Sequence, residues 1–350
     1  MHKRRHCIAP ILAWLVALVP IGAHAAFFCV NSAASLQAAL NAAASNGQSD
    51  EIDIQAGNYT VVPGGFFYVS NEANSITMFG GFDATCEQRT AARTTFDGSG
   101  LYQVMRIIIG SNSTAASVNI QHITFIDGKS TTNSGGGLRV STLNGNVVLE
   151  ANRFLLNHAN NSAGALYVET SGGISVRNSL FFANDAFDVG AAMLVTSAST
   201  VFFAGNTVVS NTAASTLPMT PIGGLLVTGG TGAHLWLSNN ILWNNGNGSV
   251  DLESSAVFTA RNNDIGFMAG IPPDPQSQNN LSVDPAFATC SGLLCLNFNL
   301  QRASPLVDAG FDTPLGGIGA FDLEDKPRMI GPHVDIGAYE EDVIFRNGFE

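Results

Sequence analysis

A motif repeated through the middle of the chain constrains the fold more than any other feature. An apolar-alternating segment is followed by Asn, one further residue and a large apolar residue. This happens five times, with the asparagines at Asn152, Asn178, Asn206, Asn239 and Asn263. Their spacings are 26, 28, 33 and 24 residues, and a second motif of the Gly-Gly-Leu-Arg-Val140 type keeps step with them. Two motifs in phase indicate a solenoid of short repeats.

Each repeat is short and rich in strand-forming residues. Val, Ile, Leu and Phe alternate with polar residues, and Gly and Asn bound each segment. No repeat contains a helix-length periodic segment, which argues against leucine-rich and α/β repeats, and propeller blades need about 40 residues or more. The sequence therefore predicts an all-β protein, a right-handed parallel β-helix (a solenoid) whose three-stranded coils stack at about 4.8 Å.

The repeated asparagines are expected to form a structural ladder. Stacked amides can hydrogen-bond from coil to coil and satisfy buried backbone groups at a sharp bend. We therefore expect all five asparagines to be buried and to lie above one another. A row of ligand-binding amides is the alternative. The residues two positions further on are expected to form an interior column, made of Phe154, Leu180, Val208, Ile241 and Ile265.

Both ends of a solenoid expose strand edges and need covers. Leu36, Ala39, Leu40 and Ala43 share one helical face, which predicts a short capping helix over residues 33–46. At the other end the repeat stops near Ile265 and a Pro-rich connector follows. We expect a parallel β-helix over residues 26–270 and a non-repeating β/loop module with a tail over residues 271–350.

The first 25 residues have the pattern of a signal peptide. Lys3, Arg4 and Arg5 precede an apolar run over residues 8–21, and Ala23-His-Ala25 offers a cleavage site. An uncleaved membrane anchor is the alternative, but the run is short for a bilayer. The sequence predicts export with cleavage after Ala25, which would place the protein outside the cell, at its surface or in the periplasm.

The cysteines predict two disulfides. Four remain once Cys7 leaves with the signal peptide, and exported proteins fold in an oxidising compartment. Cys290 and Cys295 are close in sequence and would close a small loop, which leaves Cys29 to pair with Cys86. A zinc site is the alternative, although no His lies at ligand spacing near either pair.

Motifs at both ends of the chain carry a family resemblance. They include Ile52-Asp-Ile-Gln-Ala-Gly-Asn-Tyr59 near the start, and Val283-Asp-Pro-Ala-Phe287 and Val334-Asp-Ile-Gly-Ala-Tyr-Glu340 near the end. The first resembles the start of secreted bacterial right-handed parallel β-helix proteins of pectate-lyase-like fold. The others look like a choice-of-anchor Q domain. The resemblance implies an exported β-helix protein and brings no established activity with it.

The acidic residues give little support for a catalytic site. Fifteen basic and 27 acidic residues give a formal charge of −12, which argues against nucleic-acid and anionic-membrane partners. A polysaccharide lyase or hydrolase of this fold needs carboxylates gathered in neighbouring columns, and the aligned repeats gather none. Asp185 and Asp188 share one turn and are the candidates for catalysis or Ca²⁺ binding, against the alternative that they are solvated turn residues. Asp308, Asp322 and Asp335 could likewise bind Ca²⁺ or cap turns.

These observations favour a binding protein over an enzyme. We expect an exported, non-enzymatic, monomeric β-helix protein that binds glycans or a surface partner through a polar face rich in Ser, Thr, Asn and Gly. The alternative is a polysaccharide lyase or glycoside hydrolase of the same fold. Apart from Ca²⁺ at the acidic pair, no metal or other cofactor is expected.

Overall fold

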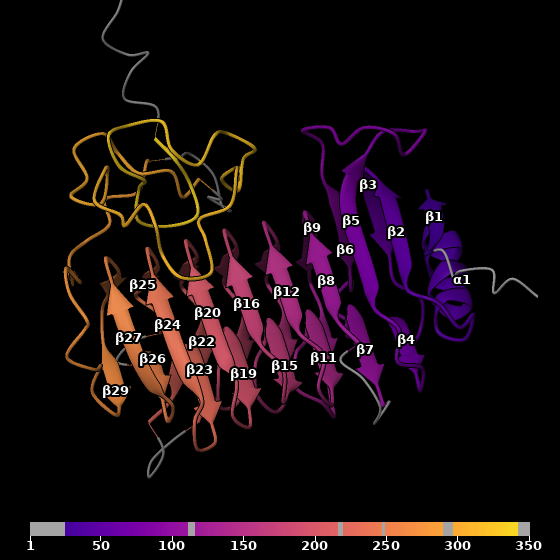
Figure 1. Cartoon of the computed structure of the whole chain (residues 1–350), viewed down its shortest axis with the longest axis horizontal. Helices are drawn as coiled ribbons and strands as arrows, with labels where there is room; N and C mark the ends of the chain where they lie inside the picture. Colours follow the sequence, from indigo (N-terminus) through magenta and orange to yellow (C-terminus); the bar gives the residue numbers. More distant parts are fainter. Residues whose placement is uncertain (1–24, 111–115, 216–219, 247–248, 290–296, 342–350) are drawn as a thin grey trace, which may run out of the picture.

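The computed structural model describes residues 25–110, 116–215, 220–246, 249–289 and 297–341. The predicted signal peptide lies outside these residues except for Ala25, and so does the predicted Cys290–Cys295 bridge. The described chain is all-β apart from one helix, and its strands pair in parallel from coil to coil to form a parallel β-helix (Figure 1).

Three long parallel sheets run along the axis of the β-helix. Sheet A contains β1 (Ala26–Val30), β2 (Asp50–Gln55), β5 (Ile76–Phe82), β8 (Val118–Gln121), β12 (Val147–Glu150), β16 (Ile174–Arg177), β20 (Thr200–Ala204), β24 (His234–Ser238) and β27 (Val257–Arg261). Sheet B contains β3 (Gly57–Thr60), β6 (Thr94–Asp97), β9 (Ile123–Ile126), β13 (Arg153–Leu155), β17 (Leu180–Phe182), β21 (Thr207–Val209), β25 (Ile241–Trp243) and β28 (Asp264–Ile265). Sheet C contains β4 (Phe66–Ser70), β7 (Met105–Ile109), β11 (Leu138–Thr142), β15 (Leu166–Thr170), β19 (Ala192–Thr196), β23 (Ile222–Gly229), β26 (Val250–Ser254) and β29 (Met268–Gly270).

A short fourth sheet lies between sheets B and C in the middle coils. Sheet D contains β10 (Lys129–Ser130), β14 (His158–Ala159), β18 (Asp185–Ala186) and β22 (Thr212–Ala213). One middle coil therefore passes through β12, β13, β14 and β15 before the next begins at β16.

The interior is filled by like residues stacked from coil to coil. Inward and outward residues alternate along the strands of sheet C, as in β11 and β15. Phe125 stacks on Phe154, and Phe154 on Phe181, with ring centroids 5.0 and 4.8 Å apart. The strand register continues this column through Val208, Leu242 and Ile265. The prediction is therefore correct at Phe154, Val208 and Ile265 but wrong at Leu180 and Ile241, which lie one residue before the column.

The asparagine ladder forms, but in two coils its rung lies one residue after the predicted asparagine. Its rungs are Asn152, Ser179, Asn206, Asn240, Asn263 and Asn280. Each rung after Asn152 accepts a hydrogen bond from the backbone N–H of the rung before it, and Asn152 accepts from the Ile123 N–H. Asn178 and Asn239 are buried, as predicted, but they lie one residue before the rungs. Both have positive φ, at 48° and 58°, a conformation that Asn tolerates better than most residues. In these two coils the repeated Asn therefore makes the bend, and the following residue makes the ladder.

A second ladder follows five residues after the first. Its rungs are Asn157, Asn184, Asn211, Asn245 and Asp251. Each asparagine of this ladder also donates to a main-chain carbonyl of the previous coil, such as Asn184 Nδ2 to Phe154 O at 2.9 Å. The two ladders lie at the two ends of sheet B and fix both of its bends.

The N-terminal end of the solenoid is covered by α1 (Ala33–Ala43). Ser32 caps this helix and accepts a hydrogen bond from the Ser35 backbone N–H. The helix ends three residues before the predicted boundary at 46, and Leu36, Ala39, Leu40 and Ala43 face the core as predicted. It lies against β1, β2 and β4 (Figure 1).

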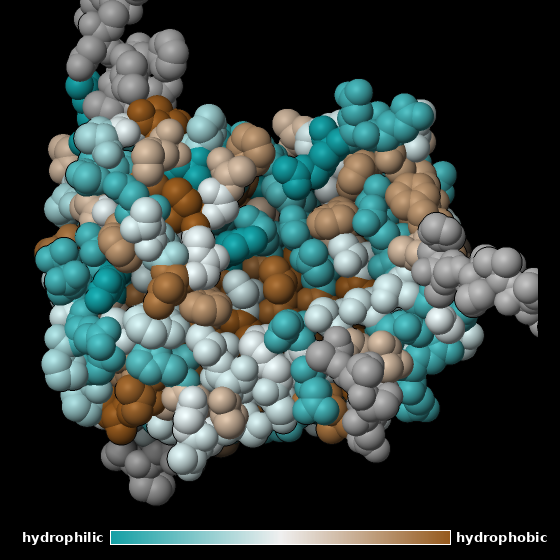
Figure 2. Space-filling view, in the orientation of Figure 1, coloured by the Kyte–Doolittle hydropathy of each residue, from teal (hydrophilic) through white to brown (hydrophobic). Residues whose placement is uncertain are grey.

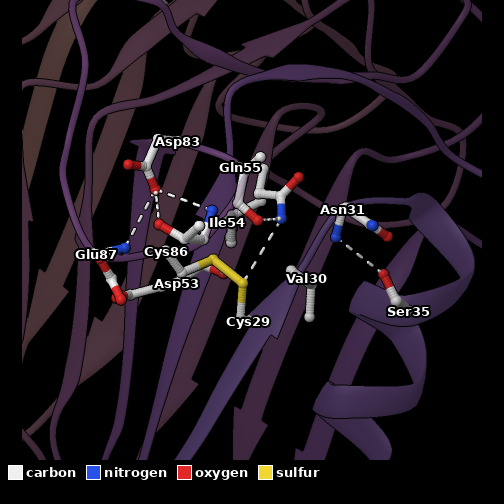
Figure 3. The surroundings of a disulfide bond; sticks show 12 residues. Cys29, Val30, Asn31, Ser35, Asp53, Ile54, Gln55, Asp83, Cys86 and Glu87 are labelled. Carbon is white, nitrogen blue, oxygen red and sulfur yellow. Dashed lines mark hydrogen bonds between the residues drawn. A yellow bond between two sulfur atoms is a disulfide. The ribbon is translucent and has the colours of Figure 1, made fainter.

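The predicted disulfide between Cys29 and Cys86 is confirmed. The Cα atoms are 5.9 Å apart, and the bond ties β1 to the turn after β5 (Figure 3). Asp83 shapes this turn, because its carboxylate accepts hydrogen bonds from the backbone N–H groups of Thr85 and Glu87. The bridge therefore holds the first strand of the solenoid to its second complete coil.

The residues after β29 form a non-repeating segment, which we call the C-terminal module (described residues 271–289 and 297–341). It lies over the outer face of sheet B, seen in orange and yellow in Figure 1. Leu306, Leu323, Ile336 and Tyr339 of the module pack in one apolar cluster with outward-facing residues of the coils, among them Leu180 and Ile241. This contact explains why Leu180 and Ile241 are apolar although they point away from the interior.

Polar groups at the two corrected positions also hold the module. Asn178 donates from its side-chain amide to the carbonyls of Ile318 and Phe321. Asn239 donates to the Phe311 carbonyl at 2.9 Å and accepts from the Phe311 N–H at 2.7 Å. The repeated Asn of these two coils therefore binds the module across the bend.

Inside the module a buried ion pair joins Arg328 to Glu340. Arg328 also donates to the carbonyls of Asp335 and Gly337, so its guanidinium has several partners although it is buried. Asp322 accepts hydrogen bonds from the backbone N–H groups of Glu324, Lys326 and Glu340. Such bonds are the turn-capping role expected for this carboxylate.

Candidate functional site

The two carboxylates of the predicted acidic pair, Asp185 and Asp188, have different partners. Asp185 Oδ2 lies 2.6 Å from His158 Nδ1, and the other ring nitrogen of His158 lies 2.9 Å from the Asn160 side-chain oxygen. Asp188 instead accepts a hydrogen bond from the Ser162 hydroxyl at 3.0 Å. Each carboxylate therefore has its own neighbour on the coil before it.

The contacts of His158 shift its pKa. Burial lowers the pKa of His158, but the hydrogen bonds to Asp185 and Asn160 outweigh it and the pKa is raised. Both ring nitrogens are already engaged. The arrangement joins His158 to the next coil through Asp185.

No metal centre appears among the described residues. Within residues 25–341, apart from the undescribed gaps, no three His, Cys, Asp or Glu side chains gather in a way that could hold an ion. The described part of the chain also contains no helix long and apolar enough to cross a membrane.

A concave surface on the solenoid lies at the carboxyl ends of the sheet C strands. It is a groove of about 520 Å³ that crosses four successive coils. We call it the sheet C groove, and its lining residues are Ile108, Ile109, Gly110, Ser141, Thr142, Leu143, Glu169, Thr170, Ser171, Val195, Thr196 and Ser197. The volume falls within the range usual for small-molecule sites.

Buried threonines hold the floor of this groove in place. Thr170 donates to the Gly145 carbonyl at 2.7 Å and accepts from the Gly172 N–H at 2.9 Å. Thr142 and Thr196 accept from backbone N–H groups three residues further on. Since these hydroxyls are used to shape the turns, the groove has a fixed form.

The polar groups open to solvent in the groove are mostly uncharged. Ser171, Ser197 and Glu169 are exposed there. Among the described residues, the hydroxyls of Ser171 and Ser197 have no hydrogen-bond partner. Glu169 is the one carboxylate among the groove's lining residues, and it accepts a hydrogen bond from the Tyr167 hydroxyl at 3.3 Å.

An aromatic ring stands beside the groove on the outer face of sheet C. The Arg139 guanidinium lies 5.0 Å from the centre of the Tyr167 ring. Burial, and then the charge of Glu169, raise the pKa of Tyr167, so its hydroxyl stays protonated and able to donate. The groove therefore offers free hydroxyls and one carboxylate acceptor, and an oriented aromatic side chain lies beside it.

Comparison with known proteins adds no relative. No protein-family model, no curated protein and no solved structure matches this chain. Its function must therefore be argued from its own surface.

The sequence prediction of a polar face did not place this groove. A signal was available, because sheet C strands end in a recurring threonine: Leu138-Arg-Val-Ser-Thr142, Leu166-Tyr-Val-Glu-Thr170 and Ala192-Met-Leu-Val-Thr196. Threonine at the same place in consecutive coils marks a turn that is shaped in the same way each time. In the later two coils the exposed Glu169, Ser171 and Ser197 beside the threonine mark the surface that those turns present.

Proposed function

We propose that this chain is an exported, non-enzymatic β-helix protein that binds a neutral glycan in the sheet C groove. The observation that carries the proposal is a preformed groove across several coils whose solvent-facing groups are hydroxyls, one carboxylate and a nearby tyrosine. Sugars are recognised by many modest hydrogen bonds together with aromatic contact. The length of the groove along the solenoid axis suits an extended ligand with repeating units.

The charge of the site favours a neutral glycan over an acidic one. Glu169 would repel a uronate carboxylate, and among the lining residues no Lys or Arg offsets it. A retaining or inverting hydrolase needs two carboxylates about 5–9.5 Å apart. With Glu169 as the lone acidic lining residue, binding is better supported than cleavage.

Export and surface location belong to the same proposal. The pattern of residues 1–25 supports a cleaved signal peptide, and the C-terminal motifs that resemble a choice-of-anchor Q domain support a role at the cell surface. We propose that the mature protein begins at Ala26 and acts as a monomer on a glycan or another surface component. Amino-terminal sequencing of the protein recovered outside the cytoplasm tests the cleavage site.

The binding test uses the purified mature chain and a panel of polysaccharides. The panel contains a xylan, a β-glucan, a galactan, pectate and alginate, and both retention and release of reducing or unsaturated ends are measured. We expect retention by at least one neutral polymer and no cleavage of any. Ser171→Trp should abolish retention by filling the groove, whereas Ser45→Trp, at an exposed site after α1, should not change it.

Two results would count against the proposal. One is cleavage of any polymer by the purified protein, which would promote the lyase or hydrolase alternative. The other is retention that Ser171→Trp leaves unchanged, which would remove the glycan from this groove.

A further inference from the structure

A second cleft lies away from sheet C, where three distant parts of the chain meet. One wall is the turn after β5, with Arg89, and the opposite wall is the C-terminal module, with Phe321. The floor is the bend between sheets A and B, with His122 and Ala151. We call this the inter-module cleft. It has a volume of about 290 Å³ and shares Arg89 and Phe321 with an adjoining depression of about 220 Å³, which Thr90 and Asp325 also line. In Figure 2 the surface is hollowed between the module and the N-terminal coils.

Arginines hold the walls of the inter-module cleft together. Arg93 donates to the Ala151 carbonyl in the floor at 3.1 Å and also to the Leu323 carbonyl of the module. Arg177 donates to Glu150 at 2.8 Å and to the Gly316 carbonyl at 2.9 Å. The cleft is therefore a fixed feature of the docked module.

Two polar side chains meet where the cleft joins the adjoining depression, and neither makes a side-chain hydrogen bond to a described residue. His122 is 9% exposed, and its Nδ1 lies 3.5 Å from Asp325 Oδ1. This oxygen is buried and is held only by charge, with Arg89 3.6 Å away. The ring nitrogens of His122 are not enclosed in the same way, and the Asp325 side chain is 28% exposed, so both side chains have hydrogen-bonding capacity left for a ligand.

The backbone also holds these two groups in a special conformation. His122 and Asp325 have φ of 59° and 63°, in the left-handed region that few residue types adopt readily. Burial, and then the charges of Arg89 and Arg93, lower the pKa of His122 to about 3. At neutral pH the imidazole is therefore uncharged and can both donate and accept.

These groups select the chemistry of the ligand. The Asp325 carboxylate needs a donor, which an ionised acid group does not offer, and the charges of Arg89 and Arg177 are already paired with Asp325 and Glu150. A metal cation would meet the guanidinium groups of Arg89 and Arg177 instead. A hydroxyl group satisfies both the carboxylate oxygen and the neutral imidazole, because it donates and accepts.

An exposed aromatic ring completes the inter-module cleft. Phe321 is 47% exposed and lines both the cleft and the adjoining depression. Aromatic side chains offer an apolar contact surface for the C–H face of a sugar ring. We propose that the inter-module cleft is a second binding site, which takes a single neutral pyranose unit with its hydroxyls on His122 and Asp325 and its ring against Phe321.

This site is independent of the sheet C groove, and its small volume suits one sugar ring and not an extended chain. The probes are therefore monosaccharides: the methyl glycosides of glucose, galactose, mannose and xylose, with glucuronate as the charged counterpart. Binding is measured by calorimetry and by saturation-transfer NMR on the mature protein. We expect at least one neutral glycoside to bind at millimolar concentration, and more tightly than glucuronate.

Three variants assign the site. His122→Asn and Asp325→Asn keep residues that tolerate positive φ, and Phe321→Ala alters an exposed side chain, so all three should fold. Each should weaken binding of the neutral glycoside at least tenfold. Phe187→Ala, at a similarly exposed phenylalanine on another face, should leave it unchanged.

Three results would contradict a sugar site in the inter-module cleft. The proposal is overturned if no neutral glycoside binds, if glucuronate binds more tightly, or if the three cleft variants bind as the wild type does. Ser171→Trp separates this site from the sheet C groove, because it should leave monosaccharide binding here intact. Failure at either site therefore leaves the other proposal standing.

Discussion

The side-chain oxygen of Asn240 accepts two hydrogen bonds from Asn206, one from the backbone N–H at 2.9 Å and one from the side-chain amide at 3.0 Å. The same amide of Asn206 donates to the Val176 carbonyl at 2.9 Å. Both asparagines are fully buried. The Asn206 side chain therefore joins its own coil to the coils on either side of it.

This relationship predicts the effect of removing a rung. Asn206→Leu should lower the free energy of unfolding by about 1–3 kcal/mol, because it removes the acceptor of the Ser179 N–H and the amide that donates to the Val176 carbonyl. The Asn240 oxygen would keep only its bond from the backbone N–H of residue 206. Urea unfolding followed by circular dichroism measures the change. Asn58→Leu, at an exposed position on β3, is the matched control and should cost much less. Equal losses in the two variants would show that the ladder contributes little.

The disulfide gives a second stability prediction. Cys29→Ser together with Cys86→Ser should lower the free energy of unfolding by about 2–4 kcal/mol, since the bridge closes a loop across a sequence separation of 57 residues. Unfolding with and without reductant provides the control: the wild type should lose stability on reduction, and the double variant should not respond. A wild type that unfolds identically under both conditions would mean that the bridge does not stabilise the N-terminal coils.

Buried carboxyl groups predict the pH dependence of stability. Burial raises the pKa of Asp53 and Asp264 to about 6. In the unfolded chain these groups titrate near 4, so folding takes up protons between about pH 4 and 6. Their contribution to stability is present at low pH and is lost as the pH rises through the folded pKa values. Urea midpoints should therefore rise from pH 7 to pH 5.

Asp264 allows this pH dependence to be assigned. Its Oδ1 accepts from the Val283 N–H at 2.9 Å, while its buried Oδ2 has no partner among the described residues. Asp264→Asn keeps the accepting oxygen and removes the charge. It should be about 2 kcal/mol more stable than the wild type at pH 7 and nearly equal to it at pH 4. A difference that does not vary with pH would contradict this explanation.

Removing the charges of Asp185 and Asp188 should change stability only slightly. Asp185→Asn with Asp188→Asn removes the partner of His158, whose pKa is raised in the folded protein. The stabilisation from that pair is present below the ordinary histidine pKa and is lost as the pH rises through the folded value. Because the pair is exposed, the double variant should lose under about 1 kcal/mol at pH 5.5 and almost nothing at pH 8. Glycan binding should be unchanged, and its loss would make this turn part of the site.

The local sequence was ambiguous at the two places where the ladder prediction is wrong. Asn178-Ser-Leu-Phe181 and Asn239-Asn-Ile-Leu242 each contain two successive apolar residues, so either can be aligned with Phe154. The strand register decides, because Arg153 pairs with Leu180, and Phe154 with Phe181. The docked C-terminal module explains the extra apolar residue, since it packs on the outer face that the repeat alone would leave to solvent.

The parallel β-helix and the helix at its N-terminal end can be inferred from patterns that are local or periodic: strand alternation, helical spacing and a repeat with two motifs in phase. The Cys29–Cys86 bridge follows from the cysteine count instead, because these two remain once Cys290 is assigned to Cys295. The position of the C-terminal module, and with it the inter-module cleft, was decided only by the tertiary structure. His122 and Asp325 are about 200 residues apart, and a chain that does not repeat leaves no pattern from which such a contact can be inferred. The contact between His122 and Asp325 depends on how the C-terminal module packs on the β-helix, which depends on the shapes of both surfaces.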